Sequence, residues 1–353
     1  MLTTLDHLPA GLLDLEAEQL SQILEGSTLI HLTGQQDPPL FVSVLLHGNE
    51  DTGWLAIRQL LRRYQEQRLP RSLSLFIGNV EAARHRLRHL DHQPDFNRIW
   101  QGGDRPEHQM AEQVLDQMRQ RGILAAIDVH NNTGRNPHYA CVSHLEDACL
   151  QLASLFDRKV LYLPRPAGLL ARAFGGLGPT IGLECGLPHL TNGTQHAHDF
   201  LEQCLQMDRV PAHPVDPESV DLLHTVAVVK VPDQVRFGFA PPDDHFPDLA
   251  LDLVLRQALD DFNFREIPAD TVLGWAQQGI PLEVKDALSG ADLLSHYFYA
   301  EAGQIKTAIP LMPGMLTQDE RGIRQDCLCY LMERYISTPE RGGQEASGVF
   351  PRG

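Results

Sequence analysis

Two histidines and two glutamates stand at the ends of apolar segments in this 353-residue chain. His47 and Glu50 lie three positions apart in a turn that contains Gly48, so both side chains can reach one cation. His130 completes a set of two histidines and one glutamate, the ligand type of hydrolytic zinc sites that keep one position open for water. Glu184 is a further acid that can serve as the general base. The pattern predicts a metal-dependent hydrolase.

Each candidate directly follows a short apolar run that is typical of a buried strand, or lies just beyond one. The runs cover residues 40–46 before His47, 123–129 before His130, and 180–183 before Glu184. Open α/β sheets bind ligands beyond the carboxyl ends of their strands, so these side chains should converge at one edge of a single sheet. Asp128, two residues before His130, could orient an imidazole from outside the ligand set.

The N-terminal two thirds of the chain alternates between strand-like and helix-like segments. Residues 73–77 and 160–163 are further strand candidates, and apolar residues recur at helical spacing over 54–64 and 108–121. In the second of these segments the apolar residues form one stripe, and Gly122 is placed to end the helix. This alternation predicts an α/β fold with a mixed, mostly parallel sheet flanked by helices.

The pattern changes after a proline-rich linker at residues 210–217. Short strand-like pieces follow at 225–231, 281–284 and 306–309, and residues 249–262 could form a helix among them. Residues 341–353 are rich in glycine and polar side chains, which is typical of a mobile terminus. We expect a catalytic domain over residues 1–215, a smaller, mainly β domain over 216–338 that covers the cleft, and a mobile tail over 339–353.

Composition narrows the choice of partners. The formal net charge is −17, from 29 Lys and Arg against 46 Asp and Glu, which argues against nucleic acid or an anionic membrane as a partner. No segment approaches the roughly 18 consecutive apolar residues of a membrane helix, and the first residues lack the basic and apolar regions of a signal peptide. The six cysteines show no disulfide or zinc-finger spacing; Cys327 and Cys329 are the nearest pair. We expect a cytoplasmic protein with reduced thiols, and a homo-oligomer is compatible with the sequence.

Simpler explanations exist for each residue taken alone. The chain has 17 histidines, so one histidine near a glutamate is weak evidence. His196 and His198 form a competing pair, but residues two apart on a helix do not share a face. A salt bridge could explain a lone Glu184, although not its position in an apolar strand. The convergence of three strand ends therefore carries the prediction.

Four short motifs in order make the sequence similar to a known family. They are Leu46-His-Gly-Asn-Glu50, Asp95-Phe-Asn-Arg-Ile99, Ile127-Asp-Val-His-Asn131 and Gly182-Leu-Glu-Cys-Gly186, with a further likeness at Gly78-Asn-Val-Glu-Ala82. Over about residues 40–190 the chain resembles the succinylglutamate desuccinylase/aspartoacylase family, which is related to the zinc carboxypeptidases. The resemblance implies a zinc carboxypeptidase-like fold and a zinc-dependent amidohydrolase that acts on linear amides, namely small N-acyl amino acids.

The resemblance also implies a metal site and a general base. It implies one zinc ion per chain, held by His47, Glu50 and His130. Glu184 matches the family's general base, which takes a proton from the attacking water and later delivers it to the leaving amine.

The substrate-binding part of the resemblance consists mainly of arginines. Asn97 and Arg98 match the pair that holds the carboxylate of a small-molecule substrate. Arg88 matches the arginine that polarises the scissile carbonyl, with Arg86 as a competitor for that role, and Arg172 matches the arginine that reads the acyl carboxylate. Independently of the resemblance, Arg98 lies between two apolar side chains, and a partly buried guanidinium pairs well with a carboxylate.

One departure from the family pattern leaves the substrate open. Family members use a tyrosine that follows a Glu-Ala pair in the C-terminal domain. Here Glu301-Ala302 is followed by Gly303 and Gln304, and the nearest tyrosines precede it, at 297 and 299. Besides an N-acyl amino acid deacylase, we consider a carboxypeptidase-like hydrolase of short peptides and a non-catalytic zinc-binding protein on the same scaffold. The presence of a base beside a full ligand set argues against the last.

Overall fold

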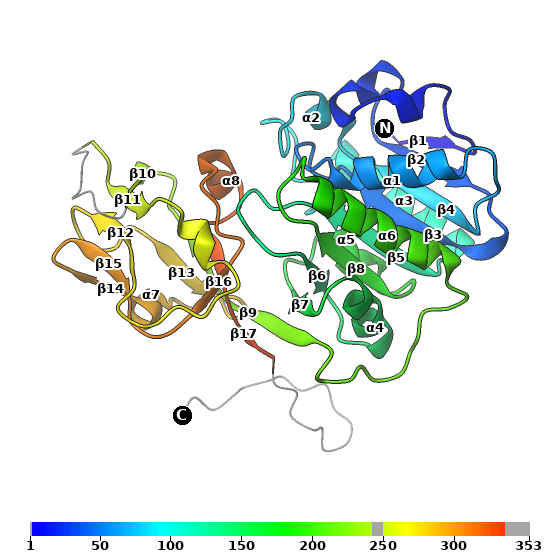
Figure 1. Cartoon of the computed structure of the whole chain (residues 1–353). Helices are drawn as coiled ribbons and strands as arrows, with labels where there is room; N and C mark the ends of the chain where they lie inside the picture. The colour runs from blue at the N-terminus through cyan, green and yellow to red at the C-terminus, as the bar shows by residue number, and fades with distance from the viewer. Residues whose placement is uncertain (1, 242–249, 336–353) are drawn as a thin grey trace.

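The computed structural model describes residues 2–241 and 250–335. The chain forms a large sheet covered by helices and a second, smaller sheet beside it (Figure 1). The predicted α/β class with an additional β-rich C-terminal part is thus confirmed. The mobile tail predicted over residues 339–353 lies outside the described residues.

The large sheet has twelve strands and contains both parallel and antiparallel pairs. Across the sheet the order is β1-β2-β4-β3-β5-β8-β6-β7-β9-β17-β16, and β13 also pairs with β9. The strands are β1 (Thr3–Leu5), β2 (Thr28–Leu32), β3 (Gln36–Val44), β4 (Arg71–Ile77), β5 (Ala125–His130), β6 (Tyr139–Val142), β7 (Lys159–Tyr162), β8 (Thr180–Glu184), β9 (Asp221–Lys230), β13 (Glu283–Asp286), β16 (Met312–Gly314) and β17 (Cys329–Arg334).

Helices cover both faces of this sheet, which explains why its central strands are apolar on both sides. Successive residues of a strand point to opposite faces. In β3, Phe41 belongs to the apolar cluster that includes α3 (Pro106–Arg121), whereas Val42 belongs to the cluster of α1 (Thr52–Arg63), α4 (Asp147–Phe156) and α6 (Thr191–Gln206). The remaining helices are short: α2 (Val80–Arg84), α5 (Leu170–Phe174), α7 (Leu294–Tyr297) and α8 (Glu320–Gln325).

The two helices expected from their apolar spacing are both present. In α3 the predicted stripe is buried, and Gly122 follows the last residue with a φ of 68°. This left-handed region suits glycine because it has no Cβ. In α1 the buried residues include Trp54, Ile57 and Leu61, which pack on the sheet.

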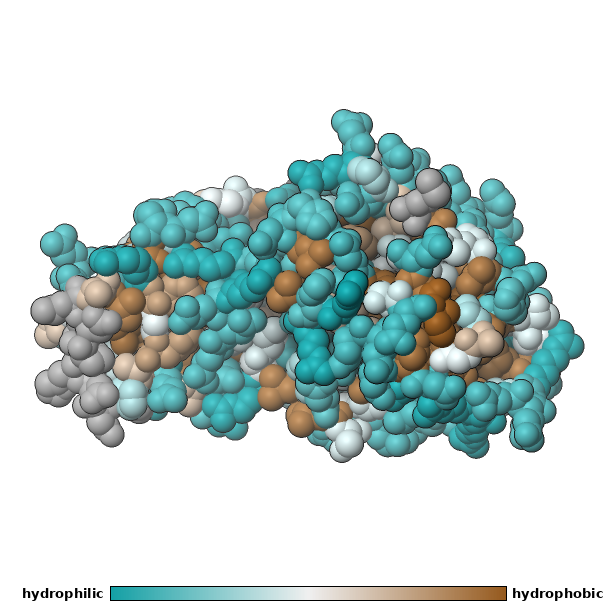
Figure 2. Space-filling model, turned by 90° about the horizontal axis from the view of Figure 1, so that it is seen from above, coloured by the Kyte–Doolittle hydropathy of each residue, from teal (hydrophilic) through white to brown (hydrophobic). Residues whose placement is uncertain are grey.

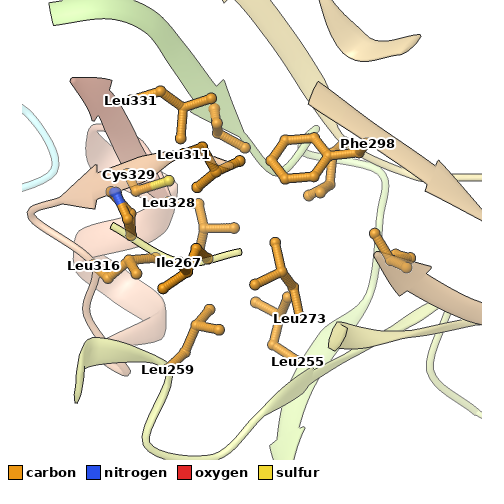
Figure 3. Close-up of a pocket in the computed structure, with 14 residues that line it drawn as sticks. Leu255, Leu259, Ile267, Leu273, Phe298, Leu311, Leu316, Leu328, Cys329 and Leu331 are labelled. Atoms are coloured by element: carbon orange, nitrogen blue, oxygen red, sulfur yellow. The ribbon is translucent and has the colours of Figure 1, made fainter. Parts of the chain in front are cut away.

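The smaller sheet has the order β10-β11-β12-β15-β14. Its strands are β10 (Phe237–Ala240), β11 (Leu253–Arg256), β12 (Val272–Ala276), β15 (Gln304–Thr307) and β14 (Phe298–Glu301). Leu255 and Phe298 of this sheet face Leu331 of β17 across an apolar cavity of about 20 Å³ (Figure 3). Such a volume holds about one water molecule, so this space is part of a shared core and not a substrate site.

One predicted element is wrong. Instead of a helix over residues 249–262, the described part of this segment contains strand β11 and a 3₁₀ turn over Leu259–Phe262. Leu253, Val254 and Leu255 are all almost fully buried, because β11 lies between β10 and β12. A short apolar run has the same composition in a buried helix and in a buried strand, so pairing with neighbouring strands decides between them.

The C-terminal part is connected to the large sheet through β-strand pairing. β9 begins at Asp221 and pairs with β7 on one side and with β17 on the other. The division into domains at residue 215 stays a prediction. All six cysteines are free, and none of the helices in the described ranges is long and apolar enough to span a membrane. Seen from above, the surface is predominantly hydrophilic over both parts (Figure 2).

Candidate metal and catalytic site

The predicted residues converge at one edge of the large sheet. β3, β5 and β8 are consecutive, parallel strands, and His130 and Glu184 are the last residues of β5 and β8. β3 pairs with β4 on its other side. After β3 the chain therefore adds β4 on one side of this strand and β5 on the opposite side. Such a reversal of strand order opens a crevice beyond the carboxyl ends of the strands. The expectation drawn from the three strand ends is met.

The turn after β3 has an unusual backbone. Leu45 has a φ of 57°, a region that side-chain-bearing residues rarely adopt. The backbone N–H of Asn79 donates to the Leu45 carbonyl and holds this conformation. Gly48 then passes so close to the first turn of α2 that a Cβ would lie 2.2 Å from the backbone nitrogen of Ala83. The turn thus requires glycine, and it directs His47 and Glu50 toward the same point.

His47, Glu50 and His130 form a compact, buried cluster. His47 Nδ1 lies 2.8 Å from Glu50 Oε1, and His130 Nδ1 lies 2.8 Å from Glu50 Oε2. One ligand atom from each residue lies within 4.8 Å of the others. Within the described ranges this is the one group of three or more acidic, histidine or cysteine side chains that a single ion could reach.

The outward nitrogens of both imidazoles contact carboxylates. His130 Nε2 lies 2.7 Å from Asp128 Oδ2, as the sequence predicted, and His47 Nε2 lies 3.0 Å from Asp95 Oδ1. A carboxylate on the outer nitrogen fixes the tautomer and the orientation of a metal-binding histidine. Both Nδ1 atoms are left facing Glu50, so they can bind one metal ion together with its carboxylate. The role of Asp95 was not predicted, although it begins one of the four motifs.

The charges of this cluster depend on one another. Burial lowers the pKa of the His130 imidazole, but Asp128 and Glu50 outweigh burial, and the net pKa lies well above its usual value. For Glu50, burial raises the pKa, but His47 and His130 outweigh it, and the net pKa is strongly lowered. A carboxylate between two imidazoles is thus stable only with positive charge beside it, which protons or a metal ion can supply.

Glu184 lies beside this cluster and has its own polar partners. Asn132 Nδ2 donates to Glu184 Oε2 at 2.8 Å and to the Tyr139 hydroxyl oxygen at 3.1 Å. Burial raises the pKa of the Glu184 carboxyl to about 7, against the opposing effect of His130. A carboxylate with such a pKa can accept a proton near neutral pH. Asn132 was not expected to contact it, since their sequence positions are far apart.

Arg88, Asn97 and Arg98 lie next to the cluster. Arg88 Nη2 donates to Asp95 Oδ2 at 2.8 Å, and its Nη1 lies 3.7 Å from Glu50 Oε1. Asn97 Nδ2 lies 3.3 Å from His130 Nε2, and its Oδ1 accepts the backbone N–H of Leu170. These contacts bring Arg88 and Asn97 to the metal cluster, and Arg98 follows Asn97 in the chain.

The two remaining candidate arginines, Arg86 and Arg172, have contacts outside the metal cluster. Arg86, the competitor of Arg88, is exposed and pairs with Glu18 at the N-terminal part of the chain. Arg172 is also exposed, and its guanidinium donates to the carbonyl oxygen of Pro164. The structure therefore favours Arg88 over Arg86 for a position near the cluster, and it brings Arg172 into no recorded contact with the cluster.

The alternative histidine and tyrosine candidates have partners of their own. His196 stacks on His138 and its Nε2 lies 2.7 Å from the Phe156 carbonyl oxygen. Tyr297 is buried in the second core, and Tyr299 donates to Asp270 at 2.6 Å.

A carboxylate from the C-terminal part reaches the arginines and was not predicted. Asp326, directly after α8, lies 3.4 Å from Arg98 Nη2 and 3.9 Å from Arg88 Nη2 through its two oxygens. It is the main cause of the raised pKa of Tyr330, a residue of β17. No motif marked Asp326 because it is 228 positions from Arg98 in the sequence.

Part of the sequence matches a known protein family. Residues 36–173 match the profile of the succinylglutamate desuccinylase/aspartoacylase catalytic domain. No curated protein sequence matches the chain. The family match includes most of the residues described above, although Glu184 lies beyond its end.

Solved structures with a similar fold extend over most of the chain. The succinylglutamate desuccinylase/aspartoacylase from Rhodobacter sphaeroides has a TM-score of 0.57 and 14% identity, covering 88% of this chain and 89% of that chain. The succinylglutamate desuccinylase from Chromobacterium violaceum has a TM-score of 0.53 and 14% identity, covering 87% of both chains. Murine aminoacylase 3 has a TM-score of 0.50 and 15% identity, covering 85% of this chain and 97% of that chain. At such identities the likeness concerns the fold.

Proposed function

Because residues 36–173 match the succinylglutamate desuccinylase/aspartoacylase catalytic domain, we propose that the chain is a zinc-dependent amidohydrolase of this family, acting on a small N-acyl amino acid. The observation that carries the proposal is the buried His47–Glu50–His130 cluster at one sheet edge, with Glu184 ending the neighbouring strand. The nearby arginines support a substrate that bears a carboxylate.

One zinc ion per chain would be held by His47 Nδ1, His130 Nδ1 and the Glu50 carboxylate. This donor set suits zinc because two imidazoles and one carboxylate leave one tetrahedral position open. The orienting carboxylates Asp95 and Asp128 support this proposal from outside the ligand set. When bound, zinc supplies a Lewis acid that makes water more acidic and a carbonyl more electrophilic.

In the proposed reaction Glu184 moves the proton. Its carboxylate takes a proton from the attacking water and later delivers this proton to the nitrogen of the leaving amine. Asn132 holds the carboxylate through Oε2, so the other oxygen can face the water. Glu184 thus serves as the base in the first step and as the acid in the second, so no other carboxylate has to transfer a proton.

Arg88 and Arg98 act on the substrate. Arg88 stabilises the negative charge that develops on the amide oxygen, and a well-placed donor of this kind contributes about 3–4 kcal/mol. Arg98 and Asn97 hold the carboxylate of the amino acid. Arg172 reads a second carboxylate on the acyl group, for substrates that have one.

A panel of substrates tests the proposal. Zinc-loaded protein is incubated with N-acetyl, N-succinyl and N-formyl amino acids beside dipeptides, and the released amine is measured. We expect turnover of at least one N-acyl amino acid, and a strongly reduced rate with the Glu184→Gln variant. Cleavage of dipeptides alone would favour a carboxypeptidase-like enzyme, and no turnover anywhere would favour a non-catalytic zinc protein.

Two variants test the substrate contacts within the same panel. Arg98→Ala should raise KM by about tenfold or more, because a charged hydrogen bond contributes roughly 1.5–3 kcal/mol. Arg172→Ala should raise KM for N-succinyl substrates and leave KM for N-acetyl substrates unchanged. An equal effect on both substrate types would contradict the role of Arg172 in reading the acyl group.

A further inference from the structure

Asp326 already occupies the contact of Arg98 that a substrate carboxylate would need. Its Oδ1 lies 3.4 Å from Arg98 Nη2, while Arg98 Nη1 donates to the Asn97 carbonyl oxygen. The same carboxylate lies 3.9 Å from Arg88 through Oδ2. The two substrate-site arginines therefore share one carboxylate that belongs to the protein.

This contact is weak enough to be exchanged. A strong guanidinium–carboxylate pair has N···O distances of about 2.7–2.9 Å and is often bidentate, whereas the Arg98–Asp326 contact is single and longer. The side chains of Arg98 and Asp326 are 29% and 32% exposed, so water can replace either partner. Partly exposed ion pairs of this kind contribute little to stability.

The position of Asp326 depends on the docking of α8. Arg321 of this helix forms a 2.9 Å ion pair with Asp91, and Asp91 lies on the same loop as Arg88 and Arg98. Three ion pairs thus join the end of the C-terminal part to the arginine-bearing loop: Arg321–Asp91, Asp326–Arg98 and Asp326–Arg88. The backbone N–H of Asp326 donates to the Gly322 carbonyl oxygen, so Asp326 is fixed to the end of α8.

We propose that Asp326 is a specificity-determining residue, whose carboxylate competes with the carboxylate of the substrate for Arg98. The inference rests on the proposed function, in which Arg98 binds that carboxylate. A ligand with one carboxylate must displace Asp326 or bind beside its negative charge. Asp326 therefore lowers the affinity for simple carboxylates and favours ligands that gain further contacts at the site.

Binding of glycine, an amino acid with a single carboxylate, to the zinc-loaded full chain tests the inference without any turnover. We compare Asp326→Asn with the unchanged protein by titration calorimetry, and Asp326→Ser serves as a second variant in case the first does not fold. Asp319→Asn is the matched control, because Asp319 is exposed at the start of the same helix and asparagine caps a helix equally well. Asp326→Asn should bind glycine about two- to fivefold more tightly, and Asp319→Asn should bind it with unchanged affinity.

The same Asp326→Asn substitution in an Arg98→Ala variant tests whether the tighter binding depends on Arg98. We expect the effect of Asp326→Asn to disappear in Arg98→Ala and to shrink at high salt. Unchanged or weaker binding by Asp326→Asn would overturn the competition, while weaker binding by Arg98→Ala alone would leave the proposed carboxylate role of Arg98 intact. Equal binding by all variants would overturn both the competition and that role, whereas hydrolysis in the substrate panel would still stand.

Discussion

His130 and Glu184 are register partners at the ends of two neighbouring parallel strands, β5 and β8. Adjacent strands lie about 4.8 Å apart, so the sheet itself sets the separation of the two backbones. Tyr139 of β6 pairs with Glu184 from the other side. The proposed general base is therefore held between two strands, and its position does not depend on the closing of a loop.

Replacement of this carboxylate separates catalysis from metal binding. Glu184→Gln keeps the shape of the side chain and its contact with Asn132 but cannot accept a proton. We expect kcat to fall by about 10²–10⁴-fold, the usual contribution of a general base, with zinc content unchanged. Steady-state kinetics and metal analysis by mass spectrometry measure both. Full activity of the variant would remove Glu184 from the mechanism.

The pH dependence of the reaction should reflect the same group. Burial raises the pKa of the Glu184 carboxyl to about 7, and a nearby cation lowers the pKa of a carboxyl. The base must be ionised, so kcat/KM should fall as the pH decreases, with a midpoint no higher than about 7. A pH–rate profile measures this limb. A rate that rises toward acid would contradict the assignment.

Asn132 should act as a positioning residue for this base. Asn132→Ala removes the donor that contacts both Glu184 and Tyr139. We expect kcat to fall by about tenfold, with KM and zinc content nearly unchanged, because a hydrogen bond to a charged group contributes roughly 1.5–3 kcal/mol. Tyr139→Phe is the matched variant, since it keeps the amide–carboxylate contact, and it should lose much less activity. Equal losses would show that the tyrosine hydroxyl matters as much as the amide.

Loss of the histidine ligands should abolish stoichiometric metal binding. The His47→Ala, His130→Ala double variant leaves Glu50 as the one remaining ligand of the cluster, so we expect zinc content to fall from about one per chain to near zero. Chelation should also lower the melting temperature of the unchanged protein by several degrees, because a ligand that binds the folded state stabilises it. His213→Ala, at an exposed histidine, is the control and should retain its zinc. A double variant with full zinc content would refute the site.

The sequence was most informative where local pattern and sheet geometry agree. The ends of β5 and β8 could be predicted because a buried strand is a short apolar run and its carboxyl end has a known function in α/β sheets. His47, Glu50 and Asp128 could be predicted for the same reason. The strand β11 could not, because its three buried residues are compatible with a helix until the neighbouring strands are known.

Local sequence patterns could not predict contacts between segments that are far apart in the sequence. Asp95 contacts His47 from a loop 48 positions away, and Asp326 contacts Arg98 from a segment 228 positions away. Neither carboxylate has a spacing that marks it as part of the site. The arginine-rich segment predicted a site for a substrate carboxylate. It gave no indication that a carboxylate of the protein, Asp326, also contacts Arg98.

The pairing of β9 with β7 has a consequence for how the chain reaches its native state. A polypeptide that ends after α6 would leave the edge of β7 unpaired, and an open strand edge promotes aggregation. During synthesis the large sheet stays incomplete until β17 has left the ribosome, since β17 pairs with β9. Such late, non-local pairings slow folding. We therefore expect the segment from β9 to β17 to govern the yield of folded protein.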